Sequence, residues 1–278
     1  MRKVAIFLVA AVVPAFGDFS YEQTSKITGG MMAGMMQFAG ALSKQAREPN
    51  VTTVAVKGNR MLHGSQHHAS IIDLDKETIT NINYDRKTYS VMTFAQMGQM
   101  MDQMGRGTKS GDMQFKVSAK DTGQKKQIAG IETHEMILTV DMAGADPQSG
   151  STGGTTMTTH MWMAPKVAGY DEITAFRKKM ATKLNWSPGG MGAMGMRPEM
   201  MKGMAEVEKE GAKLNGMPVL ETVTMGMHGE QGANGASGNL MEMTMELSGF
   251  SSGPVDGAKF DVPEGFKQTE PEMGRHRR

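Results

Sequence analysis

The methionines are the residues of this sequence whose type and spacing could do chemistry. The 278 residues include 31 Met and no Cys, so thioethers are the only soft sulfur ligands available. Soft ligands of this kind select Cu(I). A copper-binding protein is therefore one open interpretation, carried by three groups of close spacing: Met191, Met194 and Met196; Met200, Met201 and Met204; Met225, Met227 and His228.

The same side chains can instead form a deformable apolar surface. Methionine is unbranched and polarisable, and it adapts to varied apolar partners. Most of these methionines recur at the spacing of a packed strand or helix face, which favours packing or an apolar cleft over copper. The residues predicted to line such a cleft are Met136, Leu138, Val140, Met161, Met163, Val223, Met225, Met241, Met243 and Met245.

Other catalytic or cofactor-binding patterns are weak. The string Gly190–Gly195 fits G-x-G-x-x-G, but it follows Ser187-Pro188 rather than a strand, so a dinucleotide site is not expected. Asp73, Asp75 and Glu77 are read as a solvated turn rather than a calcium site. The histidines are scattered, although His134 and His160 lie on predicted strands and could meet. We therefore expect no enzyme, no cofactor and no resident metal centre.

Period-two alternation predicts that strands position these side chains. Between Leu240 and Leu247, Met241, Met243 and Met245 alternate with Glu242, Thr244 and Glu246, as in a half-buried antiparallel strand. Helical spacing interrupts the strands in four places. The expected strands are 19–27, 51–56, 60–66, 69–74, 78–83, 88–92, 131–142, 157–163, 219–227 and 240–247, and the expected helices are 31–46, 93–104, 170–184 and 198–210.

Together these elements predict an α+β fold. We expect a curved antiparallel sheet, a half-open β-barrel, with helices covering its concave face, and with helices 93–104 and 170–184 as a lid. One domain is expected over 18–270, followed by a disordered basic tail at 271–278. Gly/Met-rich inserts are expected near 144–155, 186–197 and 229–239.

The first 17 residues are typical of a cleavable signal peptide. Arg2 and Lys3 precede the apolar run 4–13, and Pro14 and the small residues at 15 and 17 follow. With no Cys, lipidation at the cleavage site is excluded, so a periplasmic or secreted protein is expected. No later segment is long and apolar enough to cross a bilayer. Removing Arg2 and Lys3 leaves 28 basic and 29 acidic residues, a charge of −1, which does not suit nucleic-acid binding.

Three strings resemble a known family. They are the residues 71–80 (IIDLDKETIT), 88–94 (TYSVMTF) and 260–266 (FDVPEGF). They are similar to strings in exported bacterial proteins that carry a domain of unknown function. The same order of motifs resembles that of the wider superfamily of periplasmic lipoprotein-carrier (LolA-like) proteins. The resemblance implies a half-open antiparallel barrel, lidded by helices, that receives acyl chains. It implies no catalytic residues.

The expected function is that of an exported binding protein. It would hold an apolar ligand, such as a lipid or the acyl chains of a lipidated protein, in a Met-rich hollow, with transient contact to an envelope membrane. Two alternatives stay open: a periplasmic Cu(I)-binding Met-rich protein, and a structural interaction protein of the cell envelope.

Overall fold

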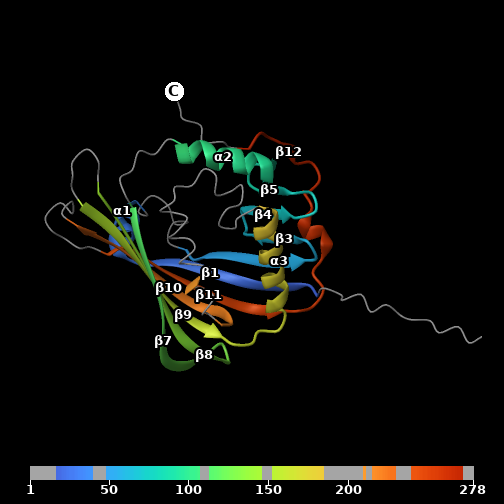
Figure 1. The fold of residues 1–278 in the computed structure, drawn as a ribbon. Coiled ribbons are helices and arrows are strands. Elements are labelled where there is room, and N and C mark those ends of the chain that lie inside the picture. Colours follow the sequence, from blue (N-terminus) through green and yellow to red (C-terminus); the bar gives the residue numbers. More distant parts are fainter. Residues whose placement is uncertain are drawn as a thin grey trace, which may run out of the picture.

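The fold is dominated by one twelve-stranded sheet (Figure 1). The computed structural model describes residues 17–39, 48–106, 113–145, 152–184, 209–210, 215–229 and 239–271. The strand order is β12-β6-β5-β4-β3-β2-β1-β11-β10-β9-β8-β7. The strands are β1 (Phe19–Gly29), β2 (Asn50–Lys57), β3 (Arg60–Gly64), β4 (His68–Asp73), β5 (Thr78–Asn83), β6 (Thr88–Thr93), β7 (Met113–Ile128), β8 (Ile131–Ala145), β9 (Thr152–Ala164), β10 (Met217–Gly229), β11 (Asn239–Ser251) and β12 (Lys267–Gln268).

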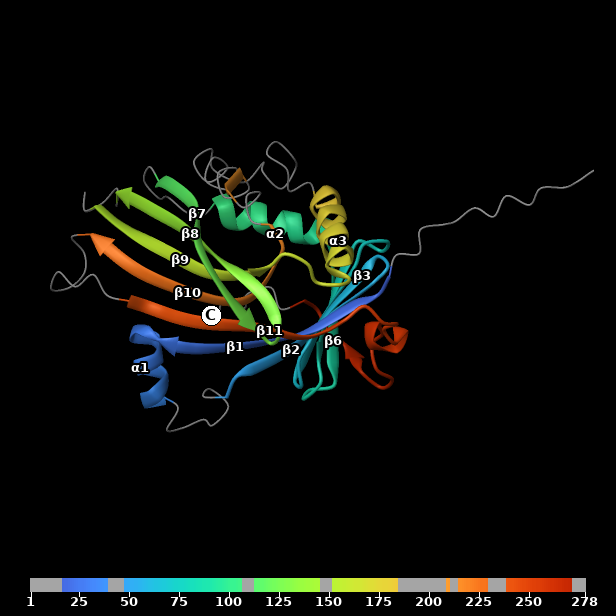
Figure 2. The ribbon, with the colours of Figure 1, turned by 90° about the horizontal axis from the view of Figure 1, so that it is seen from below.

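All neighbouring strands pair antiparallel, except β12, which pairs parallel to β6. The two wings of the sheet, β7–β11 and β2–β6, meet at β1 (Figure 2). The described helices are α1 (Gly30–Ala39), α2 (Phe94–Arg106), α3 (Tyr170–Lys183) and the short 3-10 helix η3 (Gly257–Phe260). All ten predicted strands are present.

Two hairpins of the β2–β6 wing are closed by the same turn chemistry. In the turn after β4, Asp73 Oδ1 accepts hydrogen bonds from the backbone N–H groups of Asp75 and Lys76, at 3.0 and 2.9 Å. In the turn after β5, Asn83 Oδ1 accepts from the N–H of Arg86 at 2.8 Å. Asp and Asn side chains stabilise turns in this way. The turn predicted at Asp73–Glu77 is confirmed.

One face of the sheet, the front face, packs against α3. The front-face residues Phe19 and Tyr21 of β1 join Val54 of β2 in a core with Ile173 and Phe176 of α3. Phe19 is 0% exposed and stacks with Phe250 at a centroid distance of 6.5 Å. This core therefore fixes α3 over β1 and β2.

The turn that starts α3 requires glycine. Gly169 has a φ of +85°, and a Cβ at this position would lie 2.5 Å from the Phe19 ring. A side chain here would both strain the backbone and displace the most buried aromatic ring of the core. Gly169 thus lets the chain turn onto the front face against Phe19.

The opposite, back face of the β2–β6 wing is covered by the chain between β11 and β12. Val255 and Phe260 pack on Leu62, Ile71 and Ile82. Lys57 Nζ bonds Asp18 Oδ2 at 2.7 Å and the carbonyl of Val255 at 2.9 Å. The FDVPEGF string is therefore a structural cover for strands β2–β6.

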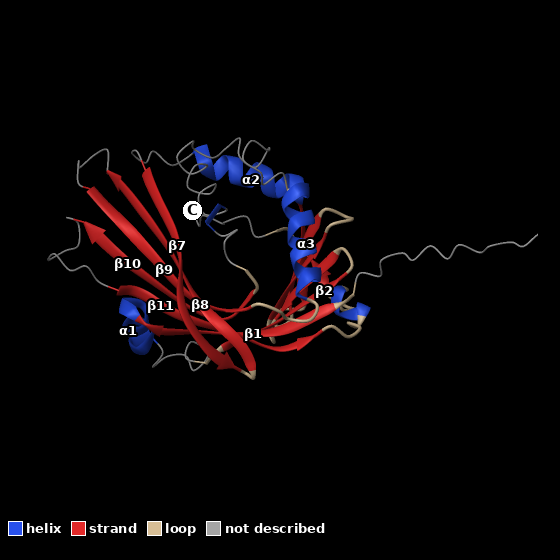
Figure 3. Ribbon diagram, turned by 60° about the horizontal axis from the view of Figure 1, so that its bottom comes forward, coloured by secondary structure: helices blue, strands red, loops and turns tan. Residues whose placement is uncertain are grey.

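The predicted α+β fold class is wrong. The described chain is mainly β, the sheet does not close, and its helices do not form a cover over a concave face (Figure 3). The apolar side of α3 is already taken up by the Phe19 core, α1 contacts β1 and β11, and α2 contacts β6. An unpredicted long strand, β7, extends the sheet further.

Several predictions concern residues outside the described ranges. These are the signal sequence up to residue 16, the insert at 186–197 and the tail from residue 272 onward. Of the predicted helix 198–210, only 209–210 are described, and they are helical. The inserts near 144–155 and 229–239 are partly replaced by strand, because β8 and β9 reach Ala145 and Thr152, and β10 and β11 reach Gly229 and Asn239.

Candidate functional site

The ten residues predicted to line an apolar cleft all lie on the front face of β8–β11. Cross-strand partners in an antiparallel sheet share a face. The register aligns nine of the ten in three rows, which we call the methionine rows, and Met163 lies next to the first row, opposite His134. The rows are Met136–Met161–Glu221–Met245, Leu138–Thr159–Val223–Met243 and Val140–Met157–Met225–Met241.

The methionine rows are only partly buried. Four of the ten residues are only 2–6% exposed: Met136, Val140, Met161 and Met163. A small cluster with Leu138 is formed by Met136, Met161 and Met163. The other residues of the predicted set are half-buried: Leu138, Val223, Met225, Met241, Met243 and Met245. The rows therefore combine a packed side on β8 and β9 with an accessible side on β10 and β11.

The expected lid does not lie over these rows. The buried side chains of α3, Ile173 and Phe176, pack in the Phe19 core rather than on β8–β10. Helix α1 contacts β11 and β1, yet its Met31 and Met35 are 59% and 65% exposed. Of the two predicted lid helices, α2 on 93–104 contacts β6 in the other wing of the sheet, and α3 packs in the Phe19 core.

Glu221, the acidic residue of the first methionine row, is influenced by the charge of Arg177 on α3. Burial raises the pKa of Glu221, and the positive charge of Arg177 on α3 opposes this shift. Burial also raises the pKa of Tyr21, again opposed by Arg177. Burial, together with Arg177, lowers the pKa of His63. The charge of Arg177 on α3 thus contributes to the pKa of all three groups.

His134 and His160 do not meet. His134 pairs with Met163 and shares the front face, whereas His160 pairs with Ile137 on the back face. On that back face, His160 Nδ1 lies 3.0 Å from Glu135 Oε1, and Thr122 Oγ1 donates to Glu135 Oε2 at 2.8 Å. These bonds hold the pKa of Glu135 below its usual range, although desolvation opposes them. The carboxylate is satisfied by structural partners.

Of the three methionine groups behind the copper alternative, one lies within the described ranges. Met225 lies in the methionine rows, and Met227 follows it on the same strand. The groups at 191–196 and 200–204 fall outside the described ranges. Within those ranges, no three His, Asp or Glu side chains are grouped as metal ligands.

Sequence reasoning missed Glu221, the one acidic member of the rows. The alternation along β10 places it with Val223 and Met225, but an acidic residue at such a position is not expected to be half-buried. Met157 belongs to the third row, and its alternation with Met161 and Met163 identified its face.

None of the described helices has the length and apolarity that a bilayer crossing requires. No protein-family model matches the chain, and none of the curated proteins is significantly similar to it.

Proposed function

We propose that this chain is exported and that its mature form holds an apolar ligand, a lipid or the acyl chain of a lipidated protein, on the methionine rows. The observation that carries the proposal is the register, which brings thioether and aliphatic side chains from four strands onto one half-buried face. Export is supported by the signal-like N-terminus and by the start of β1 at Phe19, directly after the expected cleavage site.

The dimensions and chemistry of the rows suit an acyl chain. Across the sheet, the four neighbouring strands span about 15 Å. Along each strand, the first and third rows are four residues apart, which adds about 13 Å. Burial of ten methylenes contributes roughly 8 kcal/mol. Part of this offsets the freedom that the ligand loses on binding. Methionine side chains can rearrange around chains of different length at little cost.

The proposal predicts the composition of protein purified from the periplasm of a Gram-negative host. Native mass spectrometry should give the mass of residues 18–278 together with bound lipid. A sample of the same protein extracted with organic solvent is the control and should lose the added mass. A protein that keeps residues 1–17, or one that carries no lipid before extraction, would contradict the proposal.

A further inference from the structure

Three thioethers and one imidazole lie side by side on the front face of β8 and β9. His134 pairs with Met163, and Met136 pairs with Met161, in the antiparallel register of the two strands. Cross-strand partners have Cβ atoms about 4.5–5.5 Å apart. Residues two positions apart on one strand share a face at a spacing of about 6.6–6.8 Å. We call these four residues the His–Met cluster.

The three methionines of the His–Met cluster are buried and pack together. Met136, Met161 and Met163 are 6%, 5% and 2% exposed, and Leu138 packs against them. All the buried members of this cluster are methionine. By contrast, methionine supplies two of the eleven buried residues of the core under α3, and none of those on the back face of β2–β6. Packing alone favours Leu, Ile and Val, because their rotamers are better defined. The concentration of thioethers at this place therefore suggests a second role.

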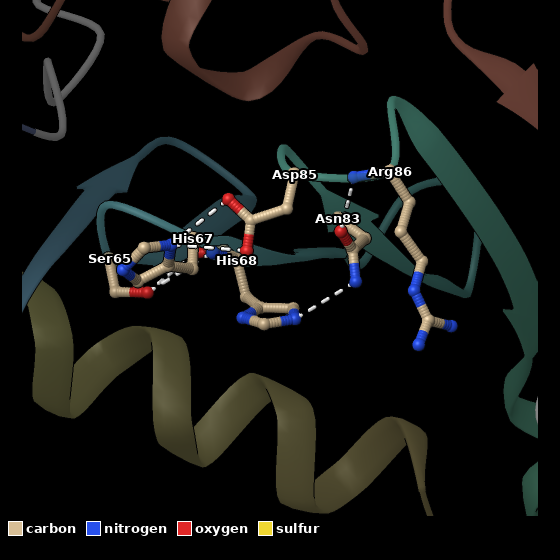
Figure 4. Close-up of polar contacts among 6 residues, drawn as sticks. All are labelled: Ser65, His67, His68, Asn83, Asp85 and Arg86. Carbon is tan, nitrogen blue, oxygen red and sulfur yellow. Dashed lines mark hydrogen bonds and ion pairs between the residues drawn. The ribbon is translucent and has the colours of Figure 1, made fainter. Parts of the chain in front are cut away.

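The imidazole of His134 differs from the other histidine side chains that the structure describes. Each of the others has a polar or sulfur partner within 3.2 Å of a ring nitrogen: His63 with Met61, His67 with Asp85 and His68 with Asn83 (Figure 4), and His160 with Glu135. Among the described residues, no hydrogen bond engages the ring of His134. His134 is half-buried at the edge of the cluster, so a ring nitrogen is available beside the three sulfur atoms.

These four ligands suit Cu(I). Thioether sulfur is a soft ligand that selects Cu(I), and imidazole also binds copper. Zinc sites in proteins are built from thiolate, imidazole and carboxylate, and the cluster contains neither thiolate nor carboxylate. All four ligands are neutral and three are buried, which favours a monovalent ion because the cost of burying charge rises with its size. Methionine side chains are unbranched and flexible, so the three sulfur atoms can converge on one ion.

We propose that His134, Met136, Met161 and Met163 bind one Cu(I) ion. None of the three methionine groups selected by their spacing in the sequence contains any of these residues, because it is the register of β8 and β9 that brings them together. The inference goes beyond the proposed acyl-chain function and does not rest on it. The ion is held on the packed side of the methionine rows, whereas β10 and β11 supply their accessible side.

Anaerobic competition for Cu(I) between the protein and the chelator bicinchoninate, with ascorbate present, tests the proposal. The parent protein should retain Cu(I), and Met161→Leu and His134→Gln should each weaken one site at least about tenfold. Leucine has nearly the volume of methionine, so the first variant keeps the packing. His134 is half-buried, so the second variant leaves the buried cluster intact. A parent protein that loses all its Cu(I) to the chelator, or unchanged binding in both variants, would overturn the proposal.

Met61→Leu is the matched control. Met61 is as buried as the methionines of the cluster, at 3% exposed, and its Sδ lies 3.2 Å from His63 Nε2, but it belongs to β3 in the other wing of the sheet. The same substitution beside a different histidine should change Cu(I) binding by less than about twofold. A loss in Met61→Leu as large as that in Met161→Leu would count against the His–Met cluster.

Methyl-selective NMR of 13C-labelled methionine locates the ion without a substitution. Addition of Cu(I) under the same anaerobic conditions should shift the methyl signals of Met136, Met161 and Met163. Shifts confined to other methionines would contradict the assignment. Met243→Arg, on the accessible side of the methionine rows, should leave Cu(I) binding unchanged within about twofold, so the copper site and the acyl-chain site can fail independently of each other.

Discussion

Met243→Arg should weaken the uptake of a fatty-acid probe such as cis-parinaric acid by at least about tenfold, or 1.4 kcal/mol. Met243 lies in the middle methionine row, opposite Val223 on one side and Ile27 on the other. Arginine has a similar length, so it fits the same space, but its guanidinium must stay hydrated or lose free energy on burial. Fluorescence titration of the purified protein measures the effect.

Thr244→Arg is the matched control. Thr244 is the next residue on β11, and it pairs with Thr222 and Lys26 on the back face. The same new charge is therefore placed on the same strand, one residue along and on the other side of the sheet. Uptake by this variant should stay within about twofold of the parent protein. Similar losses in both variants would show that the probe does not bind on the methionine rows.

Phe19→Ala should lower the free energy of unfolding by about 3–5 kcal/mol, the typical cost of removing a fully buried aromatic ring. Phe19 is 0% exposed and contacts Tyr21 and Phe250 with centroid distances of 5.8 and 6.5 Å. It also belongs to the core that holds α3 on the sheet. Urea unfolding followed by circular dichroism gives the change.

The control for this substitution is Val51→Ala on β2. Val51 is 49% exposed, so its truncation should cost less than about 1 kcal/mol. A loss of similar size at both positions would mean that Phe19 does not anchor the core. Such a result would also remove the physical reason for the position of α3 over β1 and β2.

The face of the methionine rows could be predicted because alternation is a local signal. Along β11, Met241, Met243 and Met245 alternate with acidic and threonine residues, so a single strand register places all three methionines on the same face. The strands between residues 19 and 93 were also predictable, since their turns use Asp73 and Asn83 at equivalent positions.

The fold class could not be predicted, because it depends on edges and on long-range packing. Strand β7 alternates only around Phe115 and Val117, and most of its length is polar. At the edge of the sheet, β7 pairs with β8 through backbone hydrogen bonds. Such bonds place little constraint on the type of side chain. The position of α3 depends likewise on contacts with Phe19 and Met217, which are distant in sequence.

The polar side chains that share the front face of β4, β5 and β6 left no signal in the sequence for a similar reason. Asn81 and Ser90 are ordinary strand residues until the register of β5 and β6 places them side by side. Asn83 and Arg86 belong to a turn that the Asn83 side chain stabilises, so a turn alone accounts for their residue types. Only the combined arrangement of three strands shows that polar side chains share the front face.

Methyl-selective NMR of 13C-labelled methionine tests the central claim most directly, because the proposed ligand would touch methyl groups that report on it individually. Titration with a fatty acid should shift the methyl signals of Met225, Met241, Met243 and Met245, whereas those of the exposed Met31 and Met35 on α1 should stay in place. Shifts confined to α1, or no shifts in the methionine rows at saturating fatty acid, would contradict the account.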